Sequence, residues 1–141
     1  MKRICSLILV LFVMSGAASA EVREFTKLSI NVPEGWSAEE IAGTVAAVKD
    51  DKTASLTISV EHYENGHNLA DMAQIYSQNF KGTTPKPAQN GGYTFSFNNE
   101  NTQAIIYGGI RSYILITMTG IINAPEDFKT MTASMSLKEN L

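Results

Sequence analysis

Cysteine is almost absent from this sequence. The single cysteine, Cys5, lies within the first twenty residues of the 141-residue chain. The chain therefore has no pair of thiols for an internal disulfide or for a zinc site built on two cysteines. After residue 20, no apolar run approaches the roughly 20 residues that span a membrane. We expect packing of apolar side chains to stabilise the fold, and no stable membrane insertion of residues 21–141.

The first twenty residues have the pattern of an export signal. Lys2 and Arg3 precede an apolar run over residues 4–14, and Ala18-Ser19-Ala20 is a small-x-small cleavage pattern. The alternative, an N-terminal membrane anchor, needs a longer apolar run. Cys5 precedes the apolar run, so it is not placed for lipid attachment after cleavage. We predict a signal peptide over residues 1–20, cleavage after Ala20, and a periplasmic or secreted protein.

Basic residues are outnumbered by acidic ones. The whole chain has a formal net charge of −3. Cleavage would remove two basic residues and no acidic residue, which leaves 9 basic against 14 acidic residues and a net charge of −5. Nucleic acids and anionic membrane surfaces select basic patches, so this balance argues against both classes of partner.

Alternating apolar and polar residues predict six strands in the remaining chain. They cover residues 25–32, 43–50, 53–60, 93–98, 103–107 and 112–119. The last two carry apolar residues on both faces, which is typical of central strands. A short helical turn is expected after Trp36, where Ser37 and Glu40 have a capping-box spacing. One helix should run from the cap residue Asn68 to a left-handed Gly82, and a last helix should start near Asn123, three residues before Glu126.

The predicted elements follow the order βββα-βββα. Short connections between strands indicate a mainly antiparallel sheet, with helices packed against it. We therefore expect one α+β domain over residues 21–141, in which two main helices flank a sheet of about six strands.

Several segments resemble the small exported bacterial members of the PsbP-like superfamily, of the DcrB/PsbP type. They are LSINVPEGW, GTVAAVKDDKTASLTISV, NLADMAQIYSQNFKG, GGYTFSF and YILITMTG. The resemblance covers essentially the whole mature chain and rests on element order and on the strand, Pro-x-Gly-Trp, strand opening. It implies an α/β/α sandwich and a non-catalytic accessory or binding protein, with no catalytic motif to carry over. Trp36 matches the aromatic position of the family, and we interpret its ring as closing one end of the core.

The segment EHYENGH, residues 61–67, holds both histidines of the chain. On a strand leading into it, only His62, Glu64 and His67 could converge on a zinc-type metal. The His-Glu-x-x-His spacing of a metalloprotease is absent, however, and there is no cysteine pair. The alternative is a solvated loop from a strand to a helix, which also supplies the Asn68 cap. We favour the loop and predict no metal and no cofactor.

No complete set of nucleophile, base and electrophile is present, so we expect a protein that is not an enzyme. Two hypotheses for its function remain. The first is an accessory protein that binds an unknown protein or envelope component through a sheet edge, the loop at residues 83–92, or a hydroxyl-rich face. That face would contain Ser55, Thr57, Ser59, Thr94 and Ser96.

The second hypothesis is a small-ligand carrier or a weak metallo-enzyme. Its site would lie near His62, Tyr63, His67, Tyr107 and Arg111. The forked guanidinium of Arg111 would suit a carboxylate or phosphate. The alternative for Arg111 is a solubilising charge on a hairpin, which is where arginine is usually found.

Overall fold

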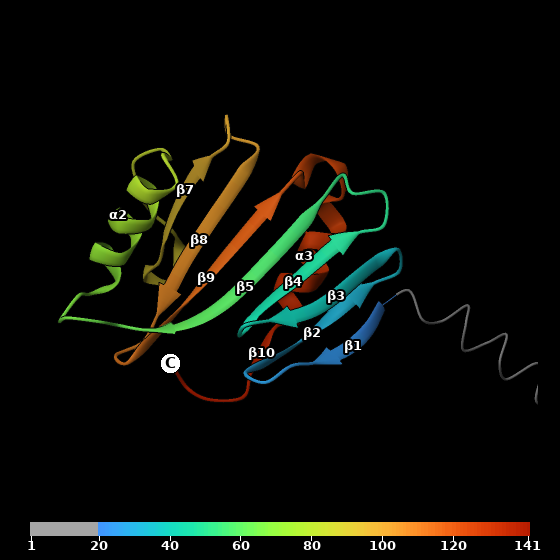
Figure 1. The fold of residues 1–141 in the computed structure, drawn as a ribbon, viewed down its shortest axis with the longest axis horizontal. Coiled ribbons are helices and arrows are strands. Elements are labelled where there is room, and N and C mark those ends of the chain that lie inside the picture. The colour runs from blue at the N-terminus through green and yellow to red at the C-terminus, as the bar shows by residue number, and fades with distance from the viewer. Residues whose placement is uncertain (1–19) are drawn as a thin grey trace, which may run out of the picture.

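The computed structural model describes residues 20–141, and it contains two antiparallel sheets (Figure 1). The smaller sheet has the order β1 (Ala20–Glu24), β2 (Leu28–Pro33), β10 (Ser136–Leu137). The larger sheet has the order β3 (Trp36–Ile41), β4 (Thr44–Lys49), β5 (Ser55–His62), β9 (Ser112–Thr119), β8 (Thr102–Gly108), β7 (Tyr93–Phe97), β6 (Lys86–Pro87). The helices described are α2 (Leu69–Asn79), α3 (Pro125–Ser134), and the 3₁₀ turns η1 (Gln89–Gly91) and η2 (Ile121–Asn123). The predicted signal peptide lies outside the described residues, apart from Ala20.

The predicted α+β sandwich with about six strands is wrong, because the described chain is mostly β. Sheets of three and seven strands replace the one expected sheet. The six predicted strands are all present, and β8 and β9 lie inside the larger sheet as expected. Strands β1, β3, β6 and β10 were not predicted. Strands β6 and β10 have only two residues each, and β1 is almost wholly exposed. None of these three strands therefore has an alternating burial pattern.

The helical turn expected after Trp36 is also wrong, since this segment forms β3. Ala42 and Gly43, both with positive φ, make a two-residue turn that places β3 beside β4. Trp36 and Ala38 are buried on one face of β3. Pairing with a neighbouring strand therefore overrides the local capping-box spacing. The Glu40 carboxylate instead accepts a hydrogen bond from the Thr26 backbone N–H at 2.9 Å.

One face of the larger sheet, here called the α3 face, packs against α3 and the smaller sheet (Figure 1). Its buried core includes Ile58, Ile114 and Ile116 from the sheet, Ile30 from β2, and Met131 from α3. Asn123 does not cap α3 as predicted, because its side-chain amide donates to the Thr53 carbonyl at 2.9 Å. Pro125 begins the helix without a side-chain cap.

The opposite face of the larger sheet, here called the α2 face, is covered only in part. Helix α2 packs against β7 and β8 at one end of the molecule, over Phe95 and Ile106 (Figure 1). The predicted Asn68 cap is confirmed, since Asn68 and Asp71 form a reciprocal capping box. No helix within residues 20–141 is both long enough and apolar enough to cross a membrane.

Candidate functional site

Within residues 20–141, no helix covers the part of the α2 face formed by β3, β4 and β5. We call it the open face (Figure 1). Its residues are Ser37, Glu39 and Ile41 of β3, Thr44, Ala46 and Val48 of β4, and Ser55, Thr57 and Ser59 of β5. The register aligns them in three rows across the strands, because Val48 lies opposite Ser37 and Ser55, and Ala46 lies opposite Glu39 and Thr57. The open face is thus a compact array of small side chains.

Two branched apolar side chains of the open face are exposed to solvent. Ile41 has an exposed fraction of 58% and Val48 one of 40%. Glu39 is the one charged residue of the open face, and Glu61 follows on the same side of β5. The open face thus combines exposed branched apolar side chains with small hydroxyl-bearing ones and little charge.

Hydroxyl groups border the open face on the side nearest α2. The hydroxyls of Thr57 and Thr117 are hydrogen-bonded to each other, and those of Thr102 and Thr119 are 2.9 Å apart. These contacts link β5 to β9 and β9 to β8 through side chains on the α2 face. The sequence gives no signal for which strand neighbours β5, so the contribution of β9 was not foreseen.

The hydroxyl-rich face predicted from the sequence is divided between two surfaces. Ser55, Thr57 and Ser59 lie on the α2 face. Thr94 lies on the α3 face, because the cross-strand row from Thr94 runs through Ile105 and Ile116 to the buried Ile58. Ser96 lies two residues along the same strand and shares that face.

Both ends of the larger sheet offer little backbone for strand addition. At β3, the Arg23 guanidinium donates to the Ala38 carbonyl at 3.4 Å, so side chains of the smaller sheet cross this edge. At the other end, residues 83–92 contain β6, a two-residue strand whose Pro87 has no N–H to donate. Among the three surfaces proposed from the sequence, the β5 part of the hydroxyl-rich face therefore does not depend on strand addition at an edge.

The EHYENGH segment forms the loop that we favoured. Asn65 and Gly66 have positive φ and make a turn, and the His67 N–H donates to the Glu64 carbonyl at 3.0 Å. His67 Nδ1 lies 3.7 Å from Asp71 Oδ2 on the first turn of α2. His62, Glu64 and His67 all help to line a hollow of about 260 Å³ beside α2.

No group of three or more His, Cys, Asp or Glu side chains within residues 20–141 is arranged to hold a metal ion. His62 follows Val60 by two residues on β5, so it projects from the α3 face. The imidazole of His67 is instead paired with Asp71 on α2. The structure therefore does not unite His62, Glu64 and His67 in one ligand set.

The second predicted set, around Arg111, is also separated. Tyr63 lies on the α2 face, where its ring packs against Tyr113 with centroids 5.1 Å apart. Tyr107 lies on the α3 face, with its hydroxyl 4.0 Å from the Met135 sulfur, and burial raises its pKa. Arg111 is exposed between β8 and β9, and its carbonyl accepts from the Tyr63 N–H at 3.3 Å. Tyr107 and Tyr63 therefore lie on opposite faces of the larger sheet.

A tyrosine pair beneath α2 was not predicted as a feature of this site. The hydroxyls of Tyr76 and Tyr113 are 2.8 Å apart. Burial, the Tyr76 hydrogen bond, and the charges of Glu61 and Glu64 raise the pKa of Tyr113. The phenol therefore stays protonated and can serve as a hydrogen-bonding group, but it is a poor general base. In the sequence, only the alternation of Tyr113 and Leu115 with Ile114 indicates on which face of the strand Tyr113 lies.

No known family model matches the chain, and no curated protein matches it. A solved structure of a protein from Bacteroides thetaiotaomicron VPI-5482 resembles 79% of this chain, with 13% sequence identity and a TM-score of 0.45. The chain spans 45% of the length of that protein. At this level of similarity the likeness carries no argument about function. The resemblance to the PsbP-like superfamily stays a prediction.

Proposed function

We propose that this chain is an exported, non-catalytic binding protein whose partner is a protein that docks on the open face. The observation that carries the proposal is the exposure of Ile41 and Val48 on a sheet surface that no helix of the described part of the chain covers. Burying such apolar groups against a partner removes them from water, which favours association. Export rests on the pattern of residues 1–20, and the non-catalytic role rests on the absence of a catalytic constellation in the sequence.

The chemistry of the open face also indicates what kind of surface its partner would present. Small residues such as Ala46 and Thr57 let a partner surface come close to the backbone of the sheet. The carboxylates of Glu39 and Glu61 add negative charge at the margin of an already acidic chain. A complementary surface would have an apolar centre with lysine or arginine at its rim, because opposite charges steer encounter and fix orientation.

Site-specific cross-linking in the native host tests this proposal. A photoreactive residue at position 48 should yield a discrete cross-linked protein, whereas the same residue at position 74 should not. Gln74 is exposed on α2, so it provides a matched control away from the open face. Cross-linking at position 74 with none at position 48 would contradict docking on the open face. Identical products at both positions would show unspecific contact, and would contradict it as well.

A further inference from the structure

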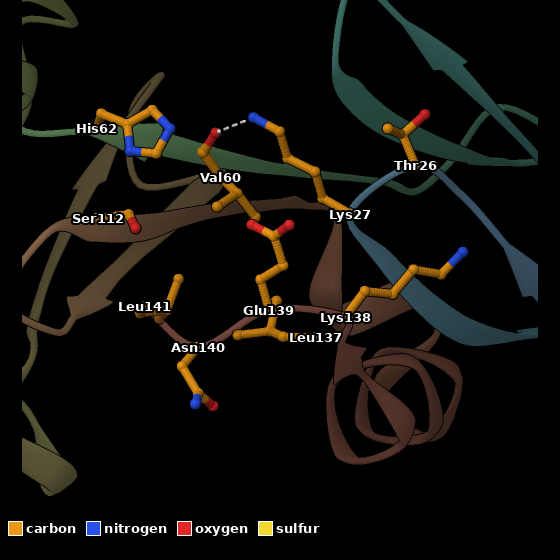
Figure 2. A pocket seen from close by; sticks show the side chains of 10 residues that line it. All are labelled: Thr26, Lys27, Val60, His62, Ser112, Leu137, Lys138, Glu139, Asn140 and Leu141. Carbon is orange, nitrogen blue, oxygen red and sulfur yellow. Dashed lines mark hydrogen bonds between the residues drawn. The ribbon is translucent and has the colours of Figure 1, made fainter.

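A second surface feature lies on the α3 face, away from the open face. It is a pocket of about 200 Å³ between the end of β5, the start of β2 and the segment that follows α3 (Figure 2). The pocket is lined by Thr26, Lys27, Val60, His62, Ser112, Leu137, Lys138, Glu139, Asn140 and Leu141. Sequence analysis singled out only His62 among these residues, because the others come from segments far apart in the chain.

One side of the pocket carries hydrogen-bond donors. Lys27 Nζ donates to the Val60 carbonyl at 3.2 Å, which leaves two of its three N–H groups for another acceptor (Figure 2). Ser112 is only 5% exposed, and it lines the same wall of the pocket. His62 lies beside them at the end of β5. The Lys27 ammonium and the Ser112 hydroxyl can both donate hydrogen bonds to an acceptor in the pocket.

The opposite side of the pocket carries a carboxylate. Glu139 projects from the C-terminal segment toward Val60 and Lys27, whereas the Lys138 ammonium and the Asn140 amide point away (Figure 2). Within the described residues no ion pair joins Glu139 to Lys27 or to His62. Opposite charges thus line one small pocket without neutralising each other.

Apolar side chains complete the wall. Val60, Leu137 and Leu141 belong to the partly buried margin of the α3-face core. The position of Leu141 depends on Gly109, because a Cβ at residue 109 would lie 2.6 Å from the Leu141 carbonyl carbon. The C-terminal segment is therefore packed in place and provides both Glu139 and one apolar side of the pocket.

We propose that this pocket binds a small zwitterion with an aliphatic part, of the class of free aliphatic α-amino acids. The ligand carboxylate would accept hydrogen bonds from Lys27 and Ser112, and its ammonium group would pair with Glu139. Its side chain would contact Val60, Leu137 and Leu141. A ligand with a single charge would leave one side of the pocket unmatched. The volume of about 200 Å³ lies below the range of roughly 300–1,000 Å³ typical of drug-sized ligands, so it selects a small molecule.

Titration of the full chain followed by amide NMR tests the proposal. L-leucine should shift the amide signals of Lys27, Ser112 and Glu139 with a Kd between about 10 μM and 1 mM, because a ligand this small has few atoms with which to gain affinity. Isovalerate and 3-methylbutylamine keep the aliphatic part and one charge each. Both should bind at least about tenfold more weakly than leucine, which corresponds to the loss of one charged contact.

Three variants test which charged side chains contact the ligand. Lys27→Met and Glu139→Gln should each weaken leucine binding at least about tenfold, and Lys138→Met, which removes a neighbouring ammonium that points away, should change it less than about twofold. Melting curves check that each variant is folded. The absence of pocket shifts up to about 10 mM leucine would overturn the proposal, since that excludes even weak millimolar binding. Equal binding of isovalerate, or equal losses in Lys27→Met and Lys138→Met, would overturn it too.

Discussion

Trp36 connects the larger sheet to α3 through its aromatic ring and through its indole N–H. Its ring meets Phe128 edge-on with centroids 5.4 Å apart, and its Nε1–H donates to Asp127 Oδ2 at 2.8 Å. The residue is 7% exposed and belongs to the core of the α3 face. This placement matches the interpretation of Trp36 as a ring that closes one end of the core.

Trp36→Ala should lower the free energy of unfolding by about 3–5 kcal/mol, because it removes a large buried ring and leaves a cavity. Trp36→Phe should cost less, since the ring packing is largely kept while Asp127 loses its donor. Urea denaturation measures both changes. Arg111→Ala is the control and should stay within about 0.5 kcal/mol of the wild type, because Arg111 is an exposed residue. A wild-type unfolding curve for Trp36→Ala would contradict the structural role.

Asp51 should titrate far below an ordinary aspartate. The Thr53 hydroxyl, the Lys49 ammonium and the Thr53 N–H all donate to its carboxylate, and they lower its pKa from 3.8 to about 2. Because the folded-state pKa is the lower one, the contribution of Asp51 to stability is present above about pH 4 and is lost as the pH falls toward about 2.

Carboxyl carbon NMR measures the titration of Asp51 directly. The wild type should show a midpoint near 2, and Thr53→Val should raise the midpoint toward 3.8, since the hydroxyl contact is the largest cause of the shift. A midpoint near 3.8 in the wild type would show that these hydrogen bonds do not persist in solution.

At the scale of single elements, the C-terminus of α2 shows how local sequence can mislead. Gly82 was predicted to take the left-handed position, but Lys81 takes it, with φ of 56°. The Gly82 N–H donates to the Ser77 carbonyl at 2.7 Å, and the Lys81 N–H donates to the Gln78 carbonyl at 3.1 Å, which is a Schellman motif. A Cβ at Gly82 would lie 2.7 Å from the Ser96 carbonyl oxygen, so close packing against β7 explains this glycine.

Substitutions at these two neighbouring positions should have opposite effects. Lys81→Gly should stabilise the protein by about 0.5–1 kcal/mol, because glycine adopts positive φ without strain. Gly82→Ala should destabilise it, because its Cβ would collide with β7. Thermal melting measures both variants. Stabilisation by Gly82→Ala would contradict this account of the α2 terminus.

At the scale of the whole molecule, the sequence predicts the long strands but not how they are divided between sheets. Alternation identifies β5 and β9 because each buries a regular apolar face. It does not identify partners, so the pairing of β2 with β1 and β10, which separates a second sheet, could not be predicted. The same limit applies to the site. Ser55 and Thr57 were identified as one face of β5, whereas the threonines beside them on β9 became neighbours only through the fold.

The two faces of the larger sheet are covered over different strands. The α3 face is covered over β3, β4, β5 and β9, and the α2 face is covered over β7 and β8. The open face, where Ile41 and Val48 are exposed, is thus not covered by any element between residues 20 and 141. A partner that docks there would complete the burial that α2 provides at the other end of the sheet.

Docking on the open face is tested by the affinity of the cross-linked partner for variants of that face. Val48→Arg places a bulky charge on the central strand of the open face and should weaken binding at least about tenfold, since a buried unpaired charge is costly. Gln74→Arg adds the same charge on α2 and should change affinity less than about twofold. Both variants should melt close to the wild type, because each side chain is exposed. Unchanged affinity for Val48→Arg would contradict the open face as the docking surface.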